Sequence, residues 1–234
     1  MNQKIISPSW NFFDVIITLI FVYTGSYIIG NAVSSIINKE ISLFVRYLLA
    51  GTVQTLLFIA VTYGVIFFKG KGNLKEIGMK GINLVENIRK GVGGGLILFI
   101  IVLFSGFIVS FLVPIEPKPQ PFAELLLKAD TPFEIFVPFF IGSFLAPLGE
   151  EVYFRGFVYP VLRKKFGVLK GIIITALFFA ALHFDAVRFI PIAVGGIGLT
   201  WLYENTGSLI TPIIAHSLWN TLMLVLLLAA SVYV

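Results

Sequence analysis

The sequence predicts an all-α, polytopic membrane protein built as a bundle of about seven or eight transmembrane helices. Of its 234 residues, 58% are hydrophobic and only 12% are charged, whereas about a quarter of the residues of a soluble domain are charged. The mean hydropathy is +0.97. Three almost uncharged runs, Phe12–Ile37, Leu43–Phe68 and Val92–Val113, are each long enough to cross about 30 Å of hydrocarbon. The lipid bilayer is therefore the first expected partner of this chain.

The remaining apolar segments are less regular. Ile135–Val161 contains three prolines and forms either one span or two. Val168–His183 and Phe189–Tyr203 are only 16 and 15 residues long, so we expect them to be held inside the bundle. Leu209–Val234 is a full span. The count is seven crossings, or eight if Ile135–Val161 is interrupted.

The basic residues predict the orientation of the bundle. Segment 69–90 holds six of the 17 basic residues and segment 163–170 holds four, whereas 114–134 holds four acids and two lysines. Because basic loops stay in the cytoplasm, we expect a multi-pass cell-membrane protein with a cytoplasmic N-terminus. The net charge of +5 is then no sign of nucleic-acid binding, and no nucleic-acid partner is expected. The absence of cysteine excludes disulfides, a thiolate nucleophile and cysteine metal ligands.

Three charged residues interrupt the most apolar part of the chain, where no other charge lies between positions 134 and 163: Glu150, Glu151 and Arg155. A charged side chain at the centre of a membrane helix costs about 2.5–3.5 kcal/mol or more, so such residues are usually functional. Pro147 predicts a helix that begins nearby, with both carboxylates in its first turn, where free N–H groups favour them. Glu151 and Arg155 are four residues apart and can pair. Glu150 is then the carboxylate that remains available for chemistry.

The only two histidines also lie in apolar runs. His183 and His216 are each 12 or 13 residues from the nearest charged residue at the predicted cytoplasmic end, as is Glu150. At about 1.5 Å per residue these three side chains lie roughly 18–20 Å deep, near mid-membrane. Asn220 lies one turn beyond His216 on the same helix face. Three separate helices thus bring polar groups to one level.

Two chemistries fit a carboxylate, two imidazoles and an amide in one cavity. In the favoured one, Glu150 acts as general base with His183 and activates a water, while His216 and Asn220 stabilise the oxyanion. In the alternative, Glu150, His183 and His216 bind a zinc ion that activates the water. The chain lacks the His-Glu-x-x-His spacing of many zinc proteases. A third interpretation is a non-enzymatic immunity or scaffold protein whose polar cluster only locks helices together.

Glycines 91, 93–95, 195, 196 and 198 lie in apolar helical segments, where small residues allow helices to approach closely. We expect close helix packing there and no nucleotide-binding loop.

The three motifs, taken in order, resemble a known family. Glu150-Glu151-x-x-x-Arg155, Phe179-x-x-x-His183 and His216-x-x-x-Asn220 are similar to those of the CAAX protease and bacteriocin-processing (CPBP, or ABI) family, which includes the Ras-converting CAAX endopeptidases. The resemblance covers about residues 147–220.

This resemblance implies an intramembrane endopeptidase with a conical polar cavity near mid-membrane. It implies that residues 131–234 form the catalytic helical core, and that residues 1–130 add N-terminal helices and a basic loop to the same membrane domain. It gives catalytic roles to Glu150, His183, His216 and Asn220, and we expect Glu151 and Arg155 to support the site. The preferred mechanism requires no cofactor, with zinc as the alternative. The expected substrate is a membrane-associated peptide or protein. Because the composition looks bacterial, peptide maturation or bacteriocin immunity is a closer analogy than the processing of prenylated CAAX proteins.

Overall fold

The computed structural model is a helical bundle with no strand among the residues it describes, which are 5, 7–36, 41–70, 73–79, 83–113 and 120–231. The elements, in chain order, are α1 (Phe12–Ile36), α2 (Leu43–Lys69), a 3₁₀ turn (Leu74–Ile77), α3 (Leu84–Leu112), α4 (Pro121–Leu127), α5 (Pro132–Phe140), α6 (Ala146–Glu151), α7 (Tyr159–Phe166), α8 (Val168–Ala181), α9 (Phe189–Thr206) and α10 (Ile210–Ser231). Helices α5 to α7 belong to one helical run, Pro132–Phe166. The predicted all-α membrane bundle is therefore confirmed.

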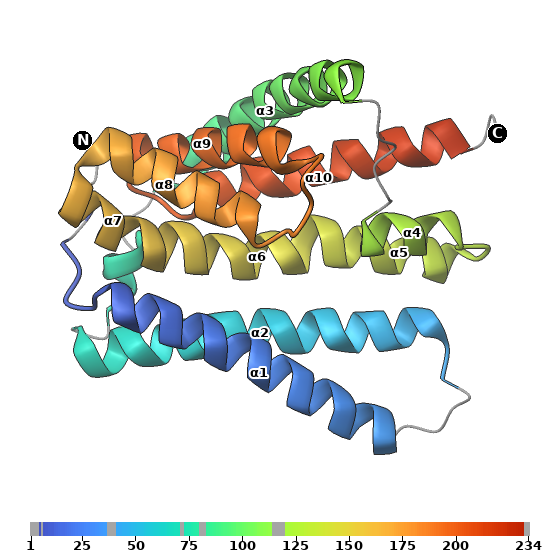
Figure 1. Ribbon diagram of the computed structural model, residues 1–234, viewed down its shortest axis with the longest axis horizontal. Coiled ribbons are helices and arrows are strands. Elements are labelled where there is room, and N and C mark those ends of the chain that lie inside the picture. The colour runs from blue at the N-terminus through green and yellow to red at the C-terminus, as the bar shows by residue number, and fades with distance from the viewer. Residues whose placement is uncertain are drawn as a thin grey trace.

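Five helical runs of the described chain are long and apolar enough to cross a membrane: α1, α2, α3, Pro132–Phe166 and α10. The other two predicted crossings correspond to α8 and α9, with 14 and 18 residues. At about 1.5 Å per residue α8 extends only some 21 Å. It turns back into α9 midway along the bundle (Figure 1), so α8 does not extend from one end to the other. The expectation that this pair is held inside the bundle is only partly met, because Leu169 and Leu177 of α8 and Trp201 of α9 are exposed.

The expected break at Pro147 does not occur. Residues 132–166 form one continuous helical run, so the eight-span alternative, and a new helix that begins near Pro147, are both wrong. Ile141–Leu145 and Val152–Val158 are π-helical turns that precede Pro147 and Pro160. A proline has no N–H for the carbonyl four residues back and its ring crowds that position. The wider π turn accommodates each proline without ending the helix, and Glu150 and Glu151 therefore lie mid-helix, without the free N–H groups of a first turn.

The helices alternate in direction between two ends of the bundle (Figure 1). We call one the basic end: α1 begins there, α2 ends there, α3 begins there, and α7 connects to α8 there. It carries most of the described basic residues, namely Lys69, Lys75, Arg89, Lys90, Arg163, Lys164, Lys165 and Lys170. At the opposite end lie the end of α3, α4 and the start of α5. Lys39, Glu40, Lys71, Lys80, Glu116 and Lys118, which also entered the charge count, lie outside the described residues.

The half of the bundle toward the basic end, which we call the basic half, is closely packed. Its core contains Tyr153, Phe157, Tyr159 and Tyr203, all buried, and Trp10 stacks on Phe157 with ring centroids 5.3 Å apart. The Trp10 indole N–H also donates to the Phe157 carbonyl at 2.9 Å. The segment before α1 thereby closes this end of the core.

Two further contacts tie the basic half together. Glu204 accepts hydrogen bonds from the Tyr159 hydroxyl at 2.7 Å and from the Arg163 guanidinium at 2.8 and 2.9 Å. Gly78 has a φ of +73°, and its carbonyl accepts from the Leu209 N–H at 3.1 Å. The 3₁₀ turn before Gly78 is thus fixed against the α9–α10 connection.

Candidate active site

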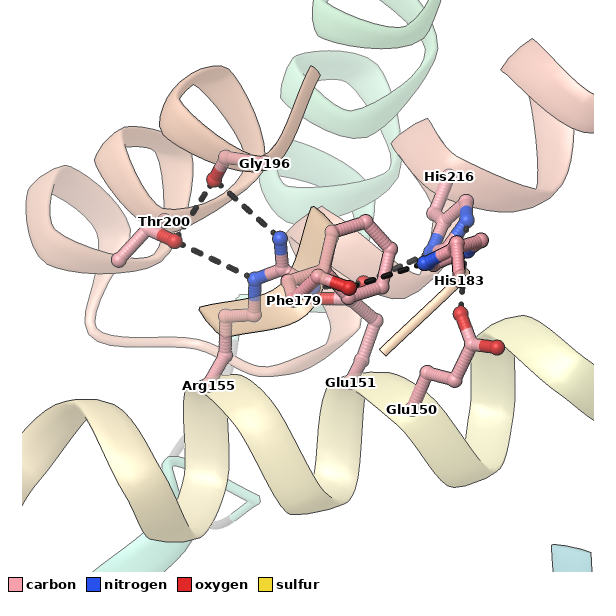
Figure 2. Close-up of polar contacts among 8 residues, drawn as sticks. All are labelled: Glu150, Glu151, Arg155, Phe179, His183, Gly196, Thr200 and His216. Atoms are coloured by element: carbon pink, nitrogen blue, oxygen red, sulfur yellow. Dashed lines mark hydrogen bonds and ion pairs between the residues drawn. The ribbon is translucent and has the colours of Figure 1, made fainter. Parts of the chain in front are cut away.

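A buried ion pair fixes the centre of the candidate site. Arg155 Nη1 lies 2.7 Å from Glu151 Oε1, and both side chains are fully buried, as the four-residue spacing predicts. The guanidinium also donates to the Gly196 carbonyl at 3.2 Å and to Thr200 Oγ1 at 3.4 Å, and lies 4.7 Å from the centre of the Phe179 ring. Arg155 therefore ties the 132–166 helix to α8 and α9 (Figure 2).

His216 lies between the two adjacent carboxylates. Its Nδ1 is 2.8 Å from Glu151 Oε1 and its Nε2 is 3.9 Å from Glu150 Oε2. Glu151 Oε1 contacts both Arg155 and His216, and this carboxylate oxygen accepts the Nδ1 proton of His216. This contact fixes the ring so that Nε2 points toward Glu150. Trp219 stacks on the other side of the imidazole, with centroids 5.3 Å apart.

His183 has a hydrogen bond that defines its tautomer. It follows the last turn of α8, and its Nδ1 lies 2.9 Å from the Phe179 carbonyl. A carbonyl only accepts hydrogen bonds, so Nδ1 carries the proton. In the neutral ring Nε2 is then an acceptor, able to hold a water or take a proton.

Glu150 is the accessible carboxylate of the pair. Its side chain is 25% exposed, whereas that of Glu151 is fully buried. Two cavities, of about 500 Å³ and about 140 Å³, meet at this position, since both are lined by Glu150, Phe179 and His183. Figure 2 shows Glu150 directed away from Arg155 and toward the two histidines. The two adjacent glutamates therefore differ in burial: Glu151 is enclosed, whereas Glu150 reaches the cavities.

Asn220 lies beside the same space. Its amide Nδ2 donates to the Gly142 carbonyl at 2.7 Å, and the residue lines the 500 Å³ cavity together with His216. The acceptor belongs to the π-helical turn Ile141–Leu145. One N–H of the amide is used in this bond, and the second can serve another acceptor.

The four predicted catalytic residues thus line one cavity, the larger one. Within the described part of the chain no three His, Cys, Asp or Glu side chains are grouped to hold a metal ion.

Several residues around the site were not predicted from the sequence. Gly196 and Thr200 anchor Arg155, although the sequence pointed only to close helix packing at the glycines. Tyr23, Gln54 and Thr55 of α1 and α2 line the smaller cavity beside Glu150. The signal available for Gln54 was its amide within the run Leu43–Phe68, in which Arg46 is the only charged residue.

The C-terminal part of the chain is similar to known proteins. Residues 132–222 match the family described as "Type II CAAX prenyl endopeptidase Rce1-like". A protein of Bacillus subtilis (strain 168) described as "Putative membrane peptidase YdiL" is 26% identical over 86 residues, which are 37% of this chain and 35% of that protein. The chain thus matches about a third of that relative's length. No solved structure matches the chain significantly.

The matched region contains all six residues of the motifs: Glu150, Glu151, Arg155, His183, His216 and Asn220. With five membrane-length helices, this describes a multi-pass membrane protein. The resemblance seen in the sequence is confirmed: residues 132–222 match the Rce1-like CAAX endopeptidase family.

Proposed function

We propose that the chain is an intramembrane endopeptidase in which Glu150 and His183 activate the water that hydrolyses a peptide bond. One observation carries the proposal: of two adjacent carboxylates, only Glu150 reaches a cavity, while Glu151 is buried against Arg155 and His216. A general base must lie within hydrogen-bond reach of the water whose proton it accepts. The Rce1-like match over residues 132–222 supports the same reaction class.

The proposed steps conserve every proton. The Glu150 carboxylate accepts a proton from the water while the water oxygen bonds to the substrate carbonyl carbon, and His183 Nε2 helps to orient that water. The carbonyl electron pair moves to oxygen and forms the oxyanion. Glu150 then gives its proton to the amide nitrogen as the carbon–nitrogen bond breaks. The products are a carboxylic acid, which ionises, and an amine.

The oxyanion needs hydrogen-bond donors, and Asn220 and His216 are placed to supply them. Asn220 has the second N–H of its amide. His216 already gives its Nδ1 proton to Glu151, so its Nε2 donates only when both ring nitrogens carry protons. We therefore propose that His216 serves the oxyanion in the form that carries a proton on each ring nitrogen.

The proposed substrate is a membrane-associated peptide or protein, and the proposed orientation has the N-terminus in the cytoplasm. The grouping of basic residues at one end of the bundle supports this orientation.

The decisive experiment compares Glu150→Gln with the wild type in lipid nanodiscs, using a library of apolar peptides and mass spectrometry of the products. Removal of the base should lower cleavage by about 10²–10⁴-fold while the unfolding transition stays unchanged. Glu151→Gln is the matched control, because it should lower both stability and cleavage. Cleavage at the wild-type rate by Glu150→Gln would exclude the mechanism.

The same preparation distinguishes the two alternatives. One equivalent of bound zinc together with cleavage that a chelator stops would favour the metal-dependent reaction. If the wild type cleaves no peptide of the library and Glu150→Gln lowers the stability, the non-enzymatic scaffold is favoured.

A further inference from the structure

We infer that substrate reaches Glu150 from the end of the bundle opposite the basic end, and that the substrate is therefore a polypeptide presented on the extracytoplasmic side. The inference rests on the proposed function for the identity of the site. Its direction rests on three independent observations: the packing of the basic half, the position of the cavities, and the distribution of charge.

The first observation is that the basic half contains a closely packed core, which lies between the candidate site and the basic end. Immediately after Arg155 the 132–166 helix buries Phe157 and Tyr159, and α9 adds the buried Tyr203. Trp10 covers Phe157 at the end of this core. A peptide that entered from the basic end would have to displace these rings and the hydrogen bonds that hold them.

The second observation is that the cavities extend from Glu150 in the other direction. The 500 Å³ cavity reaches from Glu150 and His216 to Gln120, at the start of α4, and to Leu227 in the last turns of α10. Both of these elements lie at the opposite end (Figure 1). The lining of this cavity is mostly apolar, which suits an apolar peptide segment.

The cavity on the other side of Glu150 extends the same way. The 140 Å³ cavity is lined by Glu150, Tyr23 and Gln54, and a third cavity of about 570 Å³ shares Tyr23 and Gln54 with it. The third cavity continues to Leu43, at the start of α2. Both routes to Glu150 thus lead toward the same end of the bundle, on the two sides of the 132–166 helix.

The third observation is the charge. Eight described lysines and arginines lie at the basic end (69, 75, 89, 90, 163, 164, 165 and 170), against Arg46 and Lys128 at the opposite end. Basic residues near the ends of membrane helices remain in the cytoplasm. The opposite end, toward which the cavities extend, is therefore extracytoplasmic. This assigns the substrate to exported peptides or to the outer segments of membrane proteins.

The test uses the fact that the chain contains no cysteine. Three variants each introduce a single cysteine. Gln120→Cys and Met223→Cys place it in the lining of the 500 Å³ cavity, and Lys170→Cys places it at an exposed position of the basic end. Intact cells are treated with a membrane-impermeant maleimide, before and after permeabilisation. Gln120→Cys and Met223→Cys should be labelled in intact cells, and Lys170→Cys only after permeabilisation.

Each other pattern contradicts the inference. Labelling of Lys170→Cys in intact cells would reverse the orientation. Labelling of Met223→Cys only after permeabilisation, or not at all, would show that the cavity is not reached from outside. Equal amounts of each variant in the membrane and a single unfolding transition show that the variants are folded. Because labelling needs no catalysis, the same experiment in a Glu150→Gln background separates a failure of this inference from a failure of the proposed protease activity.

Discussion

The two halves of this bundle are built in opposite ways. In the basic half the buried rings of Trp10, Phe157, Tyr159 and Tyr203 pack together. The Trp10 N–H and the Tyr159 hydroxyl both donate hydrogen bonds within this half. In the other half three cavities of about 500, 140 and 570 Å³ separate the helices. The basic half holds the structure in one arrangement, and the hollow half provides room for a ligand.

The candidate site lies at the boundary between these halves. Successive residues of a helix point about 100° apart. Glu151 therefore enters the packed core with Arg155, while Glu150 faces the cavities. The comparison teaches that a buried carboxylate paired through one oxygen with Arg155 can orient a histidine toward its accessible neighbour. Substitutions in the packed half should thus act on stability, and substitutions in the hollow half on cleavage alone.

The largest effect is expected from Arg155→Met, which removes the cation at the centre of the packed half. Glu151 would remain fully buried with only His216 as a partner, and breaking a buried ion pair costs about 3–5 kcal/mol. Unfolding titrations in mixed micelles measure the loss. The double variant Glu151→Gln/Arg155→Met should recover much of it, since no unpaired charge is then buried. A loss below about 1 kcal/mol would show that the pair does not hold the core together.

Trp10→Ala should have the next largest effect, because it removes the ring that covers the end of the packed core. The loss of its stacking on Phe157 and of its hydrogen bond should cost about 3 kcal/mol of unfolding free energy. Trp10→Phe retains a ring but leaves the Phe157 carbonyl without this donor, so about 1 kcal/mol is expected. Equal stability of Trp10→Ala and the wild type would contradict the idea that this segment closes the core.

Gly78→Ala tests the link between the 3₁₀ turn and the α9–α10 connection. Its φ of +73° is strained for alanine, and a Cβ there would lie 2.5 Å from the Gly207 carbonyl oxygen, so about 2–3 kcal/mol should be lost. Gly167→Ala is the matched control, because its φ is +81° but no atom lies within 4 Å of the added Cβ. Only the backbone strain, about 1 kcal/mol, should appear there. Identical losses at the two positions would rule out a steric contact at Gly78.

The smallest effect on stability is expected from Met223→Trp in the hollow half. The indole would occupy the 500 Å³ cavity, so the unfolding free energy should change by less than about 0.5 kcal/mol while most cleavage is lost. Leu226→Trp, on an exposed face of the same helix, is the control and should leave cleavage unchanged. If Met223→Trp cleaves the peptide library at the wild-type rate, the 500 Å³ cavity is not the path of the substrate.

The sequence predicted the membrane bundle and its two short helices because these depend on the length and hydropathy of each segment. Close packing at the glycines also followed from local composition: an added Cβ at Gly91 or Gly95 would lie within 3 Å of α10. The expected helix start at Pro147 was wrong, since sequence reasoning treats proline as a helix start or break and cannot foresee that a π turn will accommodate it.

The pairing of Glu151 with Arg155 was determined by the sequence alone, because residues four apart on a helix are neighbours wherever that helix lies. Only the tertiary structure decided that Gly196 and Thr200 hold the Arg155 guanidinium. The same is true of the position of His216 between the carboxylates of Glu150 and Glu151, and of the cavities that extend away from the basic end. These relations depend on the rotation and tilt of each helix against its neighbours. Such packing is set by contacts between distant parts of the chain, which hydropathy and residue spacing do not encode.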